Sequence, residues 1–299
     1  MLNRTPGGTR ALLAMRDDLM AAARVEPALE ALDQDFRHLF ASWFNRGFLE
    51  LRQIDWSTSA AVLEKIIAYE AVHEIRDWDD LRSRVAAPDR RLYGFFHPAL
   101  PGEPLIFVEV ALTDALPGAI GPILARDRAP LDPGEATTAV FYSISNCQTG
   151  LRGISFGNFL IKQVVEDLLR DAPGVRTFVT LSPVPGLRAW VGAELARGAG
   201  GTLSEAQRRA VLRLDPPDGS IDAEAAAGAV ERLAEIAALY LVEGKGRGGQ
   251  PADPVARFHL GNGARLERIH TGADHSGRGL RGGWGVMVNY LYDLDTIEK

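Results

Sequence analysis

Four consecutive segments between Thr137 and Leu181 decide the fold of this chain. The run TTAVFYSIS (137–145) is rich in β-branched and aromatic residues, as buried strands are, and NCQTGLRGISFG (146–157) is a loop with three glycines. The run NFLIKQVVEDLLR (158–170) has apolar residues at helical spacing, and TFVTL (177–181) has the composition of a second strand. The order of strand, glycine loop, helix and strand predicts one βαβ unit.

Two further strands precede this unit and form a predicted antiparallel hairpin. They cover Arg91 to His97 and Leu105 to Thr113, which are both rich in β-forming residues. The segment between them carries three prolines and a glycine, which favours a turn over a helix or a strand. Another strand is predicted over Phe48 to Trp56, where polar and apolar side chains alternate with a period of two.

The N-terminal part has a different pattern. Residues 9–46 carry apolar side chains every three or four positions, which predicts a helical hairpin. Gly47 separates this part from the alternating strand pattern that follows, so we place a domain boundary there. The prediction is a short helical segment over residues 1–46 and a second domain over residues 47–299.

Local patterns also predict the remaining elements. Helices are predicted over 60–74, over 77–85 and, with two Gly- or Pro-rich interruptions, over 187–243. Strands are predicted over 254–260 and 285–294, with a shorter one near 264–270.

The composition limits the class of protein. With 299 residues, 46% of them hydrophobic, and a formal net charge of −6, the chain has the profile of a soluble globular protein. It has no dense stripe of Lys and Arg with interleaved aromatic residues, which argues against nucleic acid as a partner. Its apolar runs are far shorter than the roughly 20 residues that cross a bilayer, so a membrane partner is not expected either.

Cysteine usage and the first residues indicate the compartment. Cys147 is the single cysteine, which excludes an intramolecular disulfide and a multi-cysteine zinc site and fits a reducing compartment. Asp17 and Asp18 interrupt the apolar residues of the first twenty positions, which therefore lack the core of a signal peptide. We expect a cytoplasmic protein. The histidines show no spacing typical of metal ligands, so no metal is expected.

The glycine loop is a candidate anion site. Glycines let consecutive backbone amides point toward an anion, and the N-terminus of the following helix adds a favourable dipole. GCN5-related acetyltransferases hold the pyrophosphate of coenzyme A in this way, and their order of strand, loop and helix is similar. The plainer alternative is an ordinary glycine turn. The predicted binding residues are Arg152, Gly153, Ile154, Ser155, Phe156, Gly157 and Asn158.

The same loop allows a second interpretation. The run GISFG (153–157) matches the G-x-S-x-G nucleophile elbow, and Ser155 precedes His259 as in α/β-hydrolases, which predicts a thioesterase. The elbow requires a strand that ends directly before its first glycine, whereas residues 146–152 intervene here. We therefore rank the hydrolase second.

Two short motifs carry proton-handling side chains. LSPVPG (181–186) places Ser182 before two prolines, and FHLGNGA (258–264) places His259 in an apolar stretch that ends in glycines. A serine in such a turn more often bonds to nearby backbone, and a lone histidine on a strand is more often structural. Together, however, the two motifs indicate a Ser/His pair.

These motifs resemble the active-site segments of the malonyl-CoA decarboxylase family. The resemblance runs from about Pro6 to Leu294 and includes FFHPA (95–99), residues 104–113, FYSIS (141–145) and MVNY (287–290). It implies an acetyltransferase-like α+β (α/β) fold with a mixed, mostly antiparallel central sheet, flanked by helices and preceded by a short helical segment. It also implies catalytic roles for Ser182 and His259 and supporting roles for Ser143, Tyr292 and Asp293.

The resemblance further implies an activity, the conversion of malonyl-CoA into acetyl-CoA and CO2 through an enolate. It implies no metal and no organic cofactor, since coenzyme A is part of the substrate. Residues 1–46 would be the remnant of an oligomerisation-type helical domain, which allows a homo-oligomer, and residues 47–299 the catalytic domain. An acyl-CoA-dependent acyltransferase stays open, although no acceptor groove or amine-activating base is evident. A purely structural protein would leave both motifs unexplained.

Overall fold

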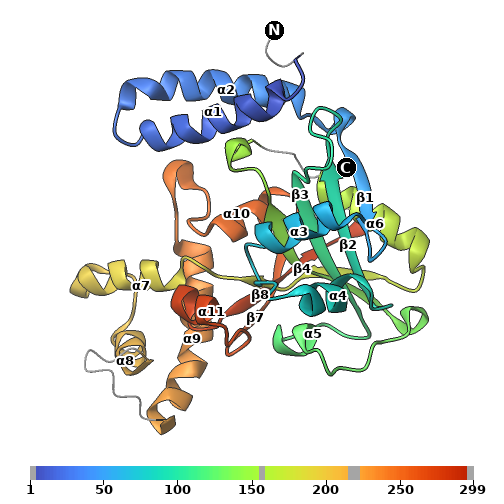
Figure 1. Ribbon diagram of the computed structural model, residues 1–299. Coiled ribbons are helices and arrows are strands. Elements are labelled where there is room, and N and C mark those ends of the chain that lie inside the picture. Colours follow the sequence, from blue (N-terminus) through green and yellow to red (C-terminus); the bar gives the residue numbers. More distant parts are fainter. Residues whose placement is uncertain (1–4, 155–158, 215–222, 295–299) are drawn as a thin grey trace. The chain divides into compact units, whose positions relative to one another are not determined.

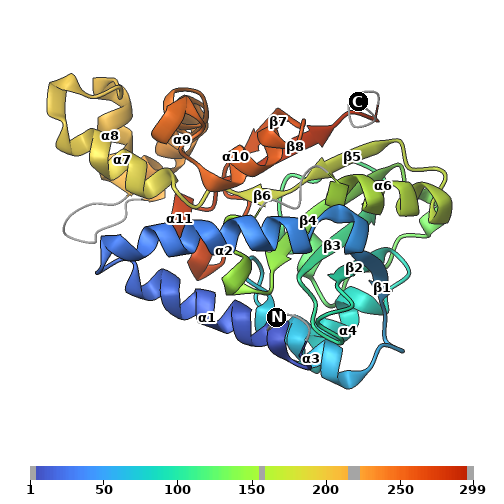
Figure 2. The same cartoon turned by 90° about the horizontal axis from the view of Figure 1, so that it is seen from above.

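The computed structural model describes residues 5–154, 159–214 and 223–294, whose elements Figures 1 and 2 show from two directions. The chain forms two compact units. The first contains Met1–Asp114 and Ala129–Arg176, and the second contains Ala115–Arg128 and Thr177–Lys299.

The first unit is built on four strands that pair antiparallel in the order β1-β2-β3-β4. They are β1 Glu50–Ile54, β2 Arg90–Phe96, β3 Ile106–Thr113 and β4 Thr138–Asn146. The strands predicted over 48–56, 91–97, 105–113 and 137–145 are thereby confirmed, as is the hairpin of β2 and β3. Every residue of β3 from Ile106 to Leu112 is buried. A strand covered on both faces carries a continuous apolar run, as β3 does apart from Glu109.

Two helices after β1 pack their apolar side chains against this sheet. α3 Ala60–Tyr69 and α4 Trp78–Val85 contribute Leu63, Ile66 and Leu81 to a core that includes Phe107 of β3. Burial of such side chains contributes about 1.5–3 kcal/mol each.

α3 ends at Tyr69, so the prediction that this helix continues to residue 74 was wrong. The carboxylate of Glu70 accepts from the amides of Val72 and His73, both at 2.7 Å. These two amides therefore bond to a side chain and not to helix carbonyls, and the helix ends before them.

The helical hairpin predicted within residues 9–46 is confirmed. It consists of α1 Gly8–Ala22 and α2 Glu30–Trp43, which lie side by side in both views (Figures 1 and 2). The helix predicted after the glycine loop is α6 Phe159–Asp171. Single 3-10 turns complete the unit: η2 Pro27–Leu29, η3 Arg46–Phe48, η4 Pro133–Glu135 and η5 Thr149–Leu151.

In the second unit, three strands pair antiparallel with β8 Met287–Tyr292. They are β5 Thr177–Thr180, β6 Ser182–Pro183 and β7 Arg265–His270, and their registers pair Phe178 with Tyr292, Ser182 with Val288 and Leu266 with Tyr290. Residues Met287 to Tyr290 are buried. β8 therefore joins β5 and β6 to β7, which lies more than 80 residues later in the sequence.

The helices of the second unit are α5 Gly121–Leu124, α7 Leu187–Ala196, α8 Glu205–Leu214, α9 Ala223–Glu243, α10 Pro254–Gly261 and α11 Gly277–Gly283, with 3-10 turns η6 Gly198–Gly200 and η7 Arg247–Gly249. α7, α8 and α9 confirm the helices predicted within 187–243. In the described part of the chain, no helix is long and apolar enough to cross a membrane.

The strand predicted over residues 254–260 was wrong, because this segment is helix α10. Asp253 caps the helix, since its carboxylate accepts from the amides of Val255 and Ala256 at 2.9 Å each. Pro254 occupies the first turn, where its missing N–H leaves no bond unmade. His259 is therefore presented by a helix.

Both units combine antiparallel strands with flanking helices, and the N-terminal helices precede the first strand. The predicted fold class of mostly antiparallel strands flanked by helices is confirmed. So is the order of strand, loop, helix and strand, as β4, α6 and β5. The domain boundary at Gly47 stays a prediction.

Candidate active site

Ser182 and His259 lie together in the second unit. The distance from Ser182 Oγ to His259 Nε2 is 3.2 Å. Both side chains belong to buried residues, which are 6% and 3% exposed respectively. The structure thus brings the two predicted catalytic residues within hydrogen-bond distance, from strand β6 and helix α10.

A bond to Thr180 fixes the direction of the Ser182 hydroxyl. Ser182 Oγ donates to Thr180 Oγ1 at 2.9 Å, and the amide of Tyr290 donates to the same Thr180 oxygen at 3.1 Å. A serine hydroxyl has a single hydrogen, and here it points at Thr180. Ser182 Oγ is therefore an acceptor toward His259.

The tautomer of His259 follows from this direction. Nε2 carries the hydrogen that Ser182 Oγ accepts, so Nδ1 of the neutral ring is an acceptor. The hydroxyl of Tyr292 lies 2.7 Å from Nδ1 and donates to it. Hydrogen bonds thus run in one direction, from Tyr292 through His259 and Ser182 to Thr180.

Burial keeps His259 and Tyr292 uncharged. Removal from water disfavours the imidazolium form and lowers the pKa of His259 to about 3. The ring of Tyr290 stacks on the imidazole, with centroids 4.8 Å apart and planes tilted by 23°. Burial also raises the pKa of Tyr292, so this phenol keeps its proton. Both groups are neutral at physiological pH.

One carboxylate links the segments that carry the pair. Asp253 caps α10, the helix of His259, and its Oδ2 also accepts from the amide of Gly186 and the hydroxyl of Tyr240, both at 3.5 Å. Gly186 follows Ser182 in the LSPVPG turn, and a β-carbon there would lie 2.2 Å from the Tyr240 hydroxyl. The glycine therefore permits the close approach of the turn to Asp253 and Tyr240.

Asn289 links three strands of the second unit. Its side chain is fully buried, its Nδ2 donates to the carbonyl of Thr180 at 2.8 Å, and its Oδ1 lies 2.6 Å from Nε2 of His270. Asn289 thus holds β5, β7 and β8 together beside the Thr180 side chain.

The other two predicted supporting residues, Ser143 and Asp293, belong to different units. Ser143 is on β4 in the first unit, where it is buried and donates to the carboxylate of Glu70, with distances of 2.9 and 2.8 Å to its two oxygens. Asp293 directly follows β8 and is half-buried. The supporting roles of both residues stay predictions.

Part of the predicted binding loop belongs to the described residues. Arg152, Gly153 and Ile154 follow η5, whereas Ser155, Phe156, Gly157 and Asn158 lie outside the described residues. The amides of Arg152 and Ile154 donate to the carbonyls of Thr149 and Leu151 at 2.9 and 3.0 Å. Of the three described positions, Gly153 is therefore the one whose amide this turn leaves for an anion.

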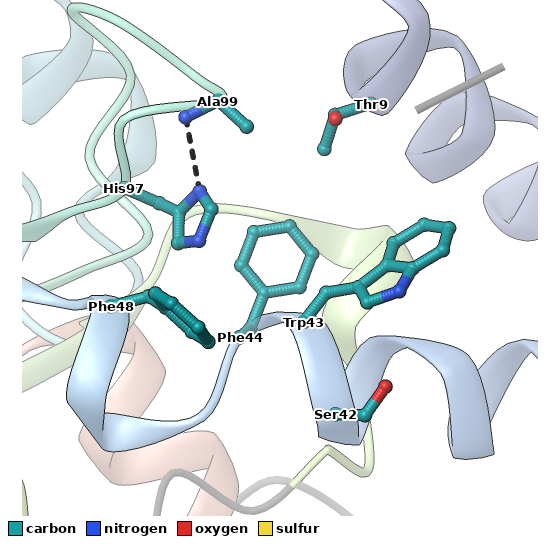
Figure 3. Close-up of a pocket in the computed structure, with 7 residues that line it drawn as sticks. All are labelled: Thr9, Ser42, Trp43, Phe44, Phe48, His97 and Ala99. Carbon is teal, nitrogen blue, oxygen red and sulfur yellow. Dashed lines mark hydrogen bonds between the residues drawn. The ribbon is translucent and has the colours of Figure 1, made fainter. Parts of the chain in front are cut away.

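A cavity of about 410 Å³ lies elsewhere in the first unit (Figure 3). Its lining residues are Thr9, Ser42, Trp43, Phe44, Phe48, His97 and Ala99. The ring of Phe44 lies 4.9 Å from that of His97, whose Nδ1 accepts from the amide of Ala99 at 3.1 Å. Burial lowers the pKa of His97, so the cavity wall is aromatic and neutral.

The sequence interpretation missed four residues of the site: Thr180, Asp253, Asn289 and Tyr290. Tyr290 lies two residues before Tyr292 on β8, so the two share a face, and Thr180 lies two residues before Ser182, at the end of β5. The Asp-Pro pair at Asp253 is a helix-start signal. These local signals were available, but the contacts that make them important come from the fold.

Comparison with known families gives this geometry its context. The malonyl-CoA decarboxylase C-terminal domain model matches residues 47–299, and the N-terminal domain model of the same enzymes matches residues 1–44. The chain belongs to the malonyl-CoA decarboxylase family.

Relatives of the malonyl-CoA decarboxylase family cover the whole chain. The mitochondrial malonyl-CoA decarboxylase of the goose Anser anser anser is 40% identical over 323 aligned positions, which are 100% of this chain and 64% of the goose protein. The chain thus spans less than two thirds of that relative. The crystal structure of malonyl-CoA decarboxylase from Rhodopseudomonas palustris matches with a TM-score of 0.94 and 56% identity, over 99% of this chain and 72% of that one.

A more distant structure shares the fold of this malonyl-CoA decarboxylase family member. A GNAT-like decarboxylase in complex with isobutyryl-CoA has a TM-score of 0.50 and 19% identity, over 82% of this chain and 99% of that one. The acetyltransferase-like fold that the sequence implied is therefore confirmed.

Proposed function

We propose that this protein decarboxylates malonyl-CoA to acetyl-CoA and CO2, with Ser182 and His259 handling the proton. The observation that carries the proposal is the bond between Ser182 and a buried, neutral His259, in a chain that belongs to the malonyl-CoA decarboxylase family.

The chemistry requires a proton but no external electron acceptor. When the bond between C2 and the carboxylate breaks, its electron pair enters the thioester carbonyl, and CO2 leaves. The enolate then takes one proton at C2 and becomes acetyl-CoA. The protein must hold the thioester, stabilise the enolate oxygen and supply that proton, and a positioned acid contributes about 10²–10⁴-fold to such a step.

The direction of the hydrogen bonds favours a relay for the proton. With substrate bound, the Ser182 hydroxyl turns from Thr180 to C2, delivers its hydrogen there and takes the Nε2 hydrogen of His259, while the hydroxyl of Tyr292 protonates Nδ1. The imidazole stays neutral throughout, as its buried site requires. The tyrosinate that remains is a far weaker base than the enolate. Before the next turnover it takes back the Nδ1 hydrogen, while Nε2 regains a hydrogen from Ser182 and Ser182 is reprotonated from solvent.

Binding of coenzyme A is proposed for the glycine loop. Arg152 and Gly153 belong to it, and Arg152 or Lys162 of α6 offers positive charge for the pyrophosphate. The GNAT-like decarboxylase with the same fold was solved with isobutyryl-CoA, which supports an acyl-CoA as the ligand class. The proposed partners are accordingly malonyl-CoA and acetyl-CoA, without a further cofactor.

The proposed activity can be tested in deuterated water. Purified protein is incubated with malonyl-CoA and the products are followed by mass spectrometry, beside Ser182→Ala, His259→Asn and the exposed control His275→Asn. We expect deuterated acetyl-CoA, and a rate that falls about 100-fold or more with either site variant, within the range of a lost general acid. The control should keep the wild-type rate.

Other products would identify the alternatives. Unchanged malonyl-CoA would contradict the decarboxylase. Free malonate and coenzyme A, lost with Ser155→Ala, would identify the thioesterase. Transfer of the acyl group to an added amine would identify an acyltransferase.

We infer that the protein acts in a reducing compartment such as the cytoplasm. Its single cysteine, Cys147, is buried, and burial raises the pKa of its thiol, so it is a poorly reactive thiol and not half of a disulfide. A homo-oligomer, formed through the helices of residues 1–46, remains a prediction.

A further inference from the structure

The helical hairpin grips the glycine loop through a buried arginine. Arg16 of α1 is completely buried, with Nη1 donating to the carbonyl of Gly150 at 2.6 Å and Nη2 to that of Arg152 at 3.0 Å. Its Nε donates to Asp33 of α2 at 2.9 Å. A guanidinium that bonds two carbonyls of one turn fixes the orientation of their peptide groups.

The contact between the hairpin and the loop is close. A β-carbon on Gly150 would lie 2.3 Å from the carbonyl oxygen of Leu13 in α1, so a side chain at this position would clash with helix backbone. Gly150 therefore lets the loop lie directly against α1. The hairpin and residues 149–154 form one packed structure within the first unit.

A second arginine of the hairpin faces the loop. Arg37 of α2 donates through Nε to the other oxygen of Asp33 at 2.7 Å, and its side chain is 53% exposed. The Cζ, Nη1 and Nη2 atoms of Arg37 lie 3.6 to 3.7 Å from the point where a β-carbon on Gly153 would be. Asp33 thus aims the outer edge of the Arg37 guanidinium at the turn at Gly153.

The Asp33 carboxylate serves both arginines. Burial raises its pKa, but the hydrogen bonds from Arg16 and Arg37 outweigh burial, so its pKa is lowered and it stays ionised. Two cations share one anion, which leaves a net positive charge beside the loop. For Arg37, the bonds found among the described residues use Nε alone, so its two Nη groups can donate to an anion as a fork.

We propose that Arg37 binds a phosphate group of coenzyme A beside Gly153, and that Arg16 positions the loop that receives it. The inference rests on the proposed binding of acyl-CoA at the glycine loop. It gives the hairpin a role in substrate binding, in addition to the oligomerisation predicted for it. Gly153 has a positive φ of 78°, and the absence of a side chain there lets a phosphate approach both its amide and Arg37.

Binding measurements test the role of Arg37. Coenzyme A is titrated into the wild-type chain, Arg37→Gln, Arg37→Lys and Arg24→Gln, a control that removes an exposed arginine after α1. Loss of hydrogen bonds between charged groups should raise the Kd of Arg37→Gln about 10- to 100-fold. Arg37→Lys should recover part of the affinity, and Arg24→Gln should match the wild type. An unchanged Kd for Arg37→Gln, or an equal loss with Arg24→Gln, would overturn the assignment.

Shortened ligands identify the phosphate group. If the loss of affinity in Arg37→Gln persists with dephospho-coenzyme A, Arg37 binds the pyrophosphate, and if it disappears, Arg37 binds the 3′-phosphate. In turnover, the preference in kcat/KM for malonyl-CoA over malonyl-pantetheine should fall in Arg37→Gln by the same factor as the affinity. An equal loss with both substrates would show a structural effect and contradict phosphate binding.

Arg16 requires a test that separates positioning from stability. Arg16→Met should raise KM for malonyl-CoA more than it lowers kcat, and Arg16→Lys, which can still reach one carbonyl, should lie between. Unfolding curves show whether an Arg16 variant fails to fold. If one does, Arg37→Gln remains the decisive variant. Wild-type protein that binds coenzyme A without turning over malonyl-CoA would contradict the proposed activity but leave the Kd test of Arg37 intact.

Discussion

The Tyr292 hydroxyl lies 2.7 Å from Nδ1 of His259, on the side of the ring opposite to Ser182. Because Nε2 donates to Ser182, Tyr292 must donate to Nδ1, and the histidine is held in a single tautomer. Tyr292 lies on β8 and His259 on α10, so the pairing of β8 with its neighbours determines the protonation pattern of the site.

Replacement of Tyr292 by Phe should lower kcat with little effect on KM. The variant keeps the ring and loses the donor to Nδ1, so the imidazole can adopt either tautomer and cannot be reprotonated from that side. We expect kcat to fall about 100-fold, at the lower end of the range for general acid catalysis. Steady-state kinetics with malonyl-CoA measure this, with Tyr69→Phe on α3 as the matched control. A variant with wild-type kcat would exclude Tyr292 from the relay.

Replacement of Thr180 by Val should affect both stability and turnover. The new side chain has nearly the same shape but accepts no bond from the Ser182 hydroxyl or the buried amide of Tyr290. An unpaired buried donor costs about 1–3 kcal/mol, and urea unfolding should show a loss of this size. kcat should fall as well, since Ser182 loses its orientation, and Thr180→Ser should restore most of both quantities. Full activity in Thr180→Val would mean that Ser182 is oriented by other contacts.

The buried His259 makes stability depend on pH. Its pKa is lowered from 6.5 to about 3 on folding, so the unfolded chain takes up a proton below pH 6.5 that the folded chain does not. His259 therefore leaves the free energy of unfolding independent of pH above pH 6.5. As the pH falls from 6.5 toward 3, that free energy decreases by up to about 1.4 kcal/mol per pH unit. For the same reason His259 should add no inflection near pH 6.5 to the rate of catalysis.

Urea unfolding between pH 7 and pH 4 measures this contribution as a difference. His259→Gln should show a shallower fall of the unfolding free energy than the wild type, because glutamine takes up no proton. The exposed His275→Gln should follow the wild-type curve. Equal slopes for His259→Gln and the wild type would show that the imidazole is not held neutral.

Local patterns in the sequence predicted much of the fold. The strands of the first unit were found because each is an apolar run bounded by turn residues, as β2 and β3 are by the prolines from Pro98 to Pro104. The strand prediction for residues 254–260 was wrong because a short apolar run fits both the period of a strand and that of a helix. Here the cap at Asp253 favours the helix. Ser182 and His259 were found by their resemblance to a family.

Contacts between distant residues were beyond local patterns. Arg16 and Gly150 are 134 positions apart, and the spacing within α1 does not distinguish a buried arginine from a solvated one. The link between Gly186 and Asp253 spans 67 positions, and it depends on how α9, α10 and the Ser182 turn pack. Such contacts depend on the whole fold. They determine how the site residues are positioned, which the sequence patterns did not predict.

Replacement of Asp253 should separate helix capping from positioning of the Ser182 turn. Asp253→Asn keeps an oxygen to cap α10, but its amide hydrogens oppose the Gly186 amide, so we expect kcat to fall while stability changes little. Asp253→Ala also loses the cap, which costs about 0.5–2 kcal/mol. The control Asp77→Ala removes the comparable cap of α4 and should lower stability without lowering kcat. If Asp253→Asn keeps the wild-type kcat, the carboxylate serves the helix alone, and the turn holds Ser182 through its own prolines.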